Sequence, residues 1–153
     1  MKKIYFLICF LLICKLSLGQ VTITPNPFEV NESITITVNI NSTSTDCNGL
    51  SNPSKVYMHS GIGDDTDPWG YNVVGNWGMD DGVGEMTNTS GSLWSITLTT
   101  ETYFSLTTIQ ADNAIKMGMV FRNANGTQEL KASGCSDFFF DGRWLDPTDA
   151  LER

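Results

Sequence analysis

The stretch SITITVNI, residues 33–40, alternates apolar and polar side chains without a break. Ile34, Ile36 and Val38 fall on one face of an extended chain, and the threonines between them fall on the other. A period of two residues is typical of a β-strand with one buried face. The stretch therefore predicts a sheet that packs one side against a core.

Similar strand-like runs recur along the chain and predict an all-β protein. They occupy residues 21–24, 55–60, 92–99, 115–122, 127–131 and 138–140, the last expected to be deeply buried. Asn125-Gly126 between two of these runs is a strong hairpin signal. Only residues 107–115 could hold a turn or two of helix. The pattern predicts an immunoglobulin-like antiparallel β-sandwich of about seven to nine strands, with Trp94, Tyr103 and Phe104 in the core or on a sheet face.

Residues 1–19 carry the features of a cleavable secretion signal. Lys2 and Lys3 precede an apolar run of about eleven residues, and Ser17-Leu18-Gly19 offers small residues for cleavage. The run is shorter than the ~20 residues of a membrane-spanning helix. We therefore expect a secreted or cell-surface protein, extracellular or periplasmic, with no membrane insertion after cleavage. Residues 20–141 would form one domain and residues 142–153 a C-terminal tail.

The charge of the mature chain restricts its partners. The net charge of the whole chain is −8, and the signal removes three of its nine basic residues, leaving six against 17 acidic ones, or −11. Nucleic-acid binding depends on Lys and Arg displacing counterions from phosphates, and anionic membranes attract the same side chains. The composition excludes nucleic acid and favours neutral ligands or cations.

Two cysteines, Cys47 and Cys135, remain after removal of the signal. In an oxidising compartment a lone pair is most simply a disulfide, with two free thiols as the alternative. His59 is the only histidine in the chain, so a zinc site with these cysteines is not expected.

The segment of residues 61–85 interrupts the strand pattern and is the candidate functional loop. It is long, and it combines aromatic residues with glycines and carboxylates. Sugar rings stack their apolar faces on flat aromatics while polar neighbours bind their hydroxyls. The candidate carbohydrate-binding residues are Trp69, Tyr71, Trp77 and His59. The alternative is that the tryptophans only pin the loop to the sandwich and that His59 is structural.

The aspartates of this loop admit three interpretations. They are Asp64, Asp65, Asp67, Asp80 and Asp81. They could be solvated turn residues, they could bind calcium, with Asp64, Asp65 and Asp67 as weak candidates, or a pair could catalyse glycoside hydrolysis. Their spacing fits no EF-hand, and the chain has no G-x-S-x-G motif for a serine nucleophile. We expect no catalytic residues and no cofactor apart from the calcium alternative.

Three segments together resemble small β-sandwich modules found beside amylase-type glycoside hydrolases and in starch-utilisation proteins of Bacteroidetes. They are KVYMHSG (residues 55–61), SLWSITLT (residues 92–99) leading to Tyr103-Phe104, and MGMVFRNANGTQ (residues 117–128) followed by Ser136-Asp137-Phe138. The resemblance implies an immunoglobulin-like fold and either α-glucan binding or a linker role next to a catalytic domain. It implies a stacking role for Trp69, Tyr71 and Trp77.

The sequence therefore leads to one expected function and one alternative. We expect a secreted, non-catalytic starch- or α-glucan-binding module whose partner is a neutral poly- or oligosaccharide, with a separate glycoside hydrolase as a further candidate partner. The alternative is a structural or protein-interaction module of an extracellular assembly without a sugar ligand. It predicts tryptophans packed down on the sandwich.

Overall fold

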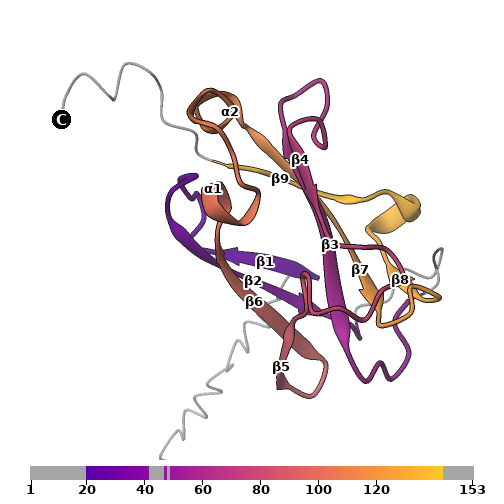
Figure 1. Cartoon of the computed structure of the whole chain (residues 1–153). Coiled ribbons are helices and arrows are strands. Elements are labelled where there is room, and N and C mark those ends of the chain that lie inside the picture. The colour runs from indigo at the N-terminus through magenta and orange to yellow at the C-terminus, as the bar shows by residue number, and fades with distance from the viewer. Residues whose placement is uncertain (1–19, 42–46, 48, 143–153) are drawn as a thin grey trace, which may run out of the picture.

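The computed structural model of the chain describes residues 20–41, 47 and 49–142, and it is built from two antiparallel sheets (Figure 1). The strands are β1 (Val21–Thr24), β2 (Ser33–Asn39), β3 (Val56–Gly63), β4 (Asn72–Val74), β5 (Thr87–Ser90), β6 (Leu93–Thr99), β7 (Lys116–Asn123), β8 (Glu129–Leu130) and β9 (Phe138–Asp141). The expected signal, residues 1–19, and all but the first residue of the expected tail lie outside the described residues.

The first sheet has the strand order β1-β2-β6-β5 and contains the stretch that predicted the fold. Ile34, Ile36 and Val38 are fully buried, whereas the threonines between them point to the opposite face. On that outer face the Thr35 and Thr97 hydroxyls lie 2.9 Å apart across β2 and β6. The apolar residues of the alternating sequence thus lie on the core face of the sheet, and the polar residues lie on its outer face.

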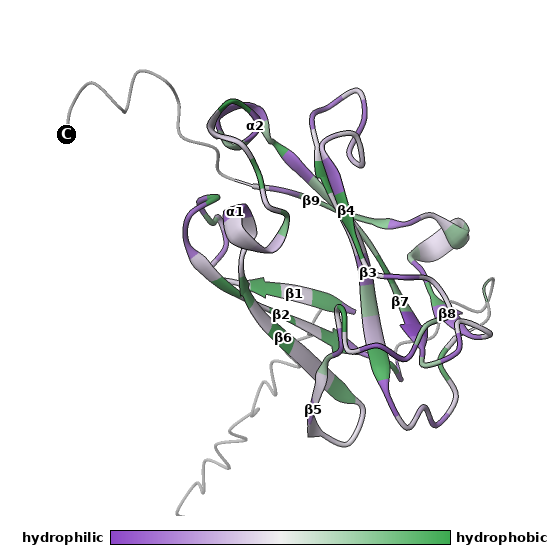
Figure 2. Ribbon diagram, in the orientation of Figure 1, coloured by the Kyte–Doolittle hydropathy of each residue, from purple (hydrophilic) through white to green (hydrophobic). Residues whose placement is uncertain are grey.

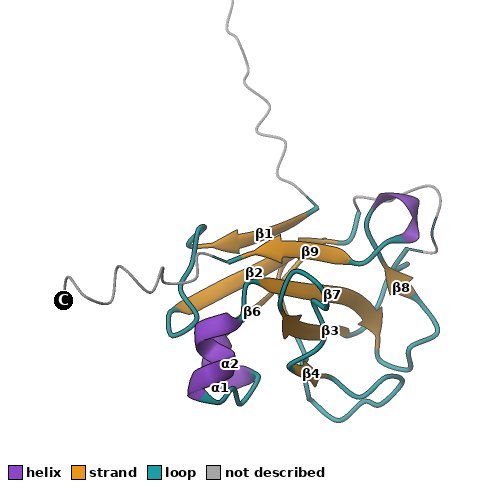
Figure 3. Cartoon of the chain, turned by 90° about the horizontal axis from the view of Figure 1, so that it is seen from above, coloured by secondary structure: helices purple, strands orange, loops and turns teal. Residues whose placement is uncertain are grey.

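The second sheet has the order β4-β3-β7-β8, and β9 also pairs with β7. The predicted hairpin joins β7 to β8, and Gly126 adopts the positive φ of 69° that such a turn requires. Two short helices, α1 (Thr100–Tyr103) and α2 (Thr108–Asn113), lie in the connection between β6 and β7 (Figure 3). α2 confirms the helical turn expected at residues 107–115, whereas α1 lies outside the range in which helix was expected.

The core lies between the two sheets, and hydrophobic and more polar residues follow one another along the strands (Figure 2). Trp94 and Phe104 belong to it, and Tyr103 packs against it half-buried, as predicted. The run of residues 138–140 is only partly buried, contrary to expectation: Phe138 is in the core, but Phe139 is 47% exposed. These residues form a strand, so successive side chains point to opposite faces.

The segment of residues 61–85 is not one irregular loop. β3 continues through Gly61 to Gly63, and β4 lies within the segment and pairs with β3. Glycines in a strand commonly mark a close approach of another part of the chain. A Cβ atom on Gly61 would collide with the Trp69 ring, and one on Gly63 with the Asp67 carbonyl. Gly61 and Gly63 therefore let this segment fold back onto the strand.

Candidate binding site on the outer face of the second sheet

Three cross-strand pairs of β3 and β7 face away from the core. The register pairs Tyr57 with Arg122, His59 with Val120, and Gly61 with Gly118. The intervening residues of both strands belong to the core, so these pairs point outward. The segment between β3 and β5 contacts all three pairs and shapes the surface above them.

Arg122 anchors this segment to the sheet. Its side chain is fully buried, and its guanidinium lies 4.4 Å from the centre of the Tyr57 ring. The guanidinium nitrogen Nη2 donates to the carbonyls of Asn76, at 2.8 Å, and Met79, at 2.9 Å. Nη1 donates to two further carbonyls, those of Asn123 and Ala124, each at 3.0 Å. The arginine fork thus fixes the backbone on both sides of Trp77.

A second cluster closes the far end of the segment. The Tyr57 hydroxyl lies within hydrogen-bonding distance of the carboxylates of Asp80 and of Glu85, the latter at 2.9 Å. Lys55 Nζ lies 2.8 Å from the Asp80 carboxylate and 3.4 Å from that of Glu85. The hydrogen bonds from Lys55 and Tyr57 lower the pKa of Asp80. The carboxylates of Asp80 and Glu85 are therefore bridged by the Tyr57 hydroxyl and the Lys55 amine.

Trp69 lies against the glycine pair. A Cβ atom on Gly118 would approach its ring atoms Cε2 and Nε1 to within 2.7–2.8 Å, and one on Gly61 would also meet the ring. The two glycines make a flat seat for the indole, which is consequently half-buried. This position agrees with the prediction that a loop tryptophan packs down on the sandwich.

Trp77 takes a different position. Its side chain is 46% exposed, and its ring meets the His59 ring edge-on, with the centres 5.5 Å apart at 89°. His59 also stacks on Trp69, with the ring centres 5.7 Å apart and the planes at 27°. The two indoles therefore stand steeply to one another, and the imidazole contacts both. They do not form a coplanar platform.

These rings line a shallow surface pocket of about 390 Å³. Val120 contributes to its lining, and Lys131 and Asp137, which lie 3.6 Å apart, contribute charged groups. Lys131 and Asp137 come from the chain on either side of η1 (Ser133–Cys135). The pocket combines aromatic faces with an amine, a carboxylate and an imidazole.

His59 presents one defined tautomer to this pocket. Its Nδ1 lies 2.9 Å from the Gly75 carbonyl, which can only accept, so Nδ1 carries the proton in the neutral ring. Burial lowers the pKa of His59, outweighing the Gly75 carbonyl, which acts in the opposite direction. The ring is therefore neutral at pH 7, and Nε2 is an acceptor.

Tyr71, the fourth predicted site residue, lies apart from the pocket. It packs against the core near α2, and its hydroxyl lies 3.4 Å from the Asn113 carbonyl. Phe139, which was predicted to lie in a buried strand and not at the site, pairs with Gly118 on the outward face. It places a further exposed ring in the same cross-strand row as the seat of Trp69.

The turn after β3 uses its aspartates locally. Asp64 Oδ1 accepts hydrogen bonds from the backbone of Thr66, at 2.9 Å, and of Asp67, at 3.0 Å, while Asp65 pairs with Lys116 at 3.1 Å. The Thr66 hydroxyl bond is the main reason why the pKa of Asp64 is lowered. Within residues 20–41, 47 and 49–142, no group of three or more His, Cys, Asp or Glu side chains is arranged to hold a metal ion.

The predicted disulfide between Cys47 and Cys135 is present. It ties the connection between β2 and β3 to η1, 88 residues later in the chain. Along the chain, Cys135 falls between Lys131 and Asp137, the two charged residues of the pocket.

Sequence reasoning identified three of the pocket residues and missed the others. Arg122 does not line the pocket but anchors the segment above it, and it carried a signal, because a lone arginine in the apolar strand MGMVFRN needs buried partners. Lys131 and Asp137 carried none, since nothing local distinguishes them from other surface charges.

The chain matches no protein-family model and no curated protein. Among the described residues, no helix is long and apolar enough to cross a membrane.

Proposed function

We propose that this protein is a non-catalytic carbohydrate-binding module whose site is the pocket around His59, Trp69 and Trp77. The observation that carries the proposal is the half-exposed indole of Trp77, held at a fixed angle over an open pocket beside a second indole. A rigid aromatic offers a sugar ring a large apolar contact at little entropic cost. Because the arginine fork of Arg122 fixes the backbone at Asn76 and Met79, Trp77 is held before ligand arrives.

The polar groups of the pocket suit hydroxyl groups. His59 Nε2 accepts, the Lys131 amine donates and the Asp137 carboxylate accepts. Lys131 and Asp137 offset one another in charge, which favours an uncharged ligand over an anion. The steep angle between the indoles suits a curved or bent chain, or a chain end, better than a flat ribbon. Together with the resemblance to starch-utilisation modules, this supports an α-glucan ligand.

Calorimetric titration with soluble starch and maltoheptaose tests the proposal, with cello- and laminari-oligosaccharides as comparators. Trp77→Ala should weaken binding roughly ten-fold, because stacking contributes about 1 kcal/mol beyond the buried area. Ile109→Ala is the matched control, since Ile109 is another large apolar side chain, 76% exposed, on α2. Absence of heat with every glucan, or full affinity in Trp77→Ala, would contradict the assignment.

A protein-docking face is the second candidate function. Val73, Met79 and Val83 are exposed apolar residues of the same segment that presents Trp77. Exposed apolar side chains that gather in one segment are a feature of interaction surfaces. Substituting Met79 and Val83 with serine should leave sugar affinity intact while abolishing any protein contact, as measured by pull-down with a candidate hydrolase.

We infer export of the protein from the three-part pattern of its N-terminal segment, which supports a secreted or cell-surface location. Mass spectrometry of the exported protein tests this inference. The expected first residue is Gln20, and a retained N-terminus would exclude cleavage.

A further inference from the structure

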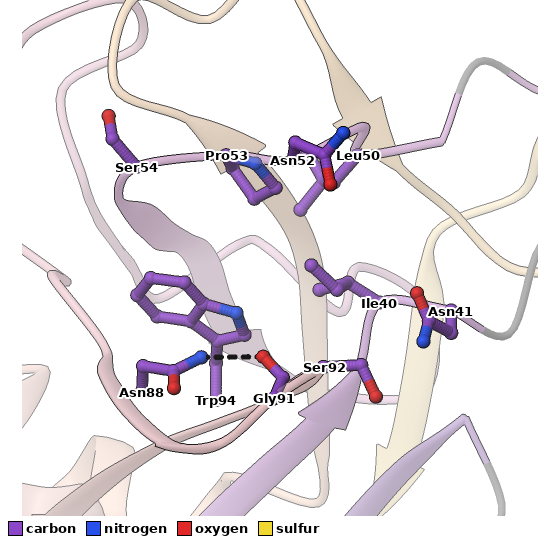
Figure 4. Close-up of a pocket in the computed structure, with 10 residues that line it drawn as sticks. All are labelled: Ile40, Asn41, Leu50, Asn52, Pro53, Ser54, Asn88, Gly91, Ser92 and Trp94. Carbon is purple, nitrogen blue, oxygen red and sulfur yellow. Dashed lines mark hydrogen bonds between the residues drawn. The ribbon is translucent and has the colours of Figure 1, made fainter.

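A second pocket, larger than the first, lies where the connection between β2 and β3 meets the turn between β5 and β6. Its volume is about 580 Å³, and it shares no residue with the pocket around Trp77. Figure 4 shows its lining: Ile40, Asn41, Leu50, Asn52, Pro53, Ser54, Asn88, Gly91, Ser92 and Trp94. The chain segments on its two sides are distant in sequence and are held together by the first sheet and the core.

The lining is uncharged throughout. None of its ten residues is acidic or basic, although the chain contains 17 acidic and nine basic residues. Ile40, Leu50 and Trp94 supply a buried apolar floor, and side chains of asparagine and serine form the rest together with Pro53 and Gly91. Such a surface offers an apolar face and neutral donors and acceptors, and it contains no partner for an ionic ligand.

Trp94 supplies the observation that points to a ligand. The side chain is 8% exposed, and its indole nitrogen is buried without an acceptor among the described residues. Figure 4 shows this nitrogen on the edge of the ring that faces Ile40 and Leu50 across the pocket. Buried indole N–H groups ordinarily have a hydrogen-bond partner. The pocket thus holds an unused donor at its floor.

The turn beside Trp94 is held in shape independently of any ligand. The Asn88 side chain donates to the Gly91 carbonyl at 2.9 Å, and Ile40 donates from its backbone to the Ser92 carbonyl at 3.0 Å. Asn52, on the opposite wall, adopts a φ of 45°, a left-handed conformation that asparagine tolerates. Both walls are therefore preformed, and the side chain of Asn52 is exposed at the rim.

We propose that this pocket is a second binding site, for a neutral saccharide unit. The ring of the sugar would pack on the floor of Ile40, Leu50 and Trp94, one of its oxygens would accept from the Trp94 indole, and its hydroxyls would exchange hydrogen bonds with the asparagines. An anion or cation lacks a counter-charge there, and a purely apolar molecule would leave the amides of the wall unpaired. The inference stands on this pocket alone and does not depend on the function proposed for the first.

Nuclear magnetic resonance of the indole N–H groups tests the two sites separately. The chain has four tryptophans and hence four such signals, which Trp69→Phe, Trp77→Phe and Trp94→Phe assign. We expect maltoheptaose, or another member of a panel of neutral oligosaccharides, to shift the Trp94 signal in the wild type. In Trp94→Phe, which keeps a ring but removes the donor, affinity at this pocket should fall about five-fold, the effect of one neutral hydrogen bond.

Two variants provide controls. Trp77→Phe makes the same chemical change at the other pocket and should leave titration of the Trp94 signal unchanged. Asn52→Gly removes a wall amide while keeping the left-handed backbone, so it should weaken binding with the fold intact even if Trp94→Phe does not fold.

The outcomes distinguish the two proposals. A shift at Trp94 alone supports the second site and contradicts the first, whereas shifts confined to Trp69 and Trp77 overturn the second site. A Trp94 shift produced only by a charged sugar or by an apolar dye overturns the assignment to neutral saccharides. A Trp94 shift that survives Asn52→Gly with unchanged affinity also overturns it.

Discussion

Arg122 shows how one side chain organises a functional surface. It makes four hydrogen bonds to carbonyls and stacks on Tyr57, all within a buried environment. The geometry requires a planar fork, which lysine does not have. The chain therefore depends on an arginine here for order in the segment that carries Trp77.

Replacement of Arg122 by methionine should lower the free energy of unfolding by about 3 kcal/mol, because it leaves several buried carbonyls unpaired. Urea denaturation measures the change. Lys116→Met is the control, since Lys116 is a half-buried surface residue paired with exposed carboxylates, and its loss should cost less than about 1 kcal/mol. Equal effects of the two substitutions would contradict the anchoring role.

The position of His59 leads us to expect that the stability of the fold depends on pH. Burial lowers the pKa of His59 below its ordinary value of 6.5. The unfolded chain therefore binds a proton at a higher pH than the folded chain, so stability should fall as pH drops from 7 through 6.5 toward the lowered folded-state pKa. The lowered pKa values of Asp64, Asp80 and Asp81 act in the same direction but only at a more acidic pH.

Urea denaturation at a series of pH values between neutrality and the carboxylate range measures this effect. His59→Asn keeps an amide donor for the Gly75 carbonyl but does not titrate, so it should lack the loss of stability near pH 6. An identical pH profile in both proteins would show that the titrating group lies elsewhere.

At the scale of the element, the pairing of β3 with β7 determines where Trp69 lies. Gly61 and Gly118 stand opposite one another in the register, and both would collide with the indole if they carried a Cβ atom. Gly118→Ala should therefore lower the free energy of unfolding by about 1–3 kcal/mol through overpacking. It should also displace Trp69 from the first pocket.

A double-mutant cycle tests this prediction. In a Trp69→Ala background the added methyl group no longer meets the indole, so Gly118→Ala should then cost less, and the coupling between the two changes should exceed about 1 kcal/mol. Additive effects would mean that Gly118 is needed for a reason other than the indole.

The elements that the sequence predicted are those with local patterns. Alternation identified β2 and β6, and Asn125-Gly126 identified the hairpin of β7 and β8. β4 and β5 were not predicted, because the first is three residues long and the second, TNTS, has no apolar face. Their pairing depends on neighbours that only the folded chain supplies.

The residues of the candidate sites also separate into those that local sequence patterns identify and those that only the folded chain brings together. Aromatic composition singled out Trp69 and Trp77, which line the pocket, but it also included Tyr71, which packs near α2 instead. His59 was singled out as the only histidine, at the mouth of the segment. Trp94 was predicted to lie in the core or on a sheet face, and it belongs to the core. Its unpaired indole nitrogen and the pocket above it depend on loops that meet only in the folded chain.

At the scale of the molecule, the disulfide connects the surroundings of both pockets. Along the chain, Cys135 falls between Lys131 and Asp137, which line the first pocket. Cys47 lies in the connection that supplies Asn41 and Leu50 to the second pocket. A single covalent bond thus constrains one wall of each.

Replacement of both cysteines by serine should lower the free energy of unfolding by about 4 kcal/mol, because a loop of 88 residues is no longer closed in the unfolded chain. Urea denaturation measures the loss, and reduction of the wild type with dithiothreitol should reproduce it while leaving the double variant unchanged. An unchanged midpoint on reduction would show that the bridge does not stabilise the fold.

Affinities measured well below the melting temperature separate two roles of the disulfide. If the bridge acts only on the unfolded chain, both pockets keep their affinity, whereas a bridge that also holds their walls weakens the two together.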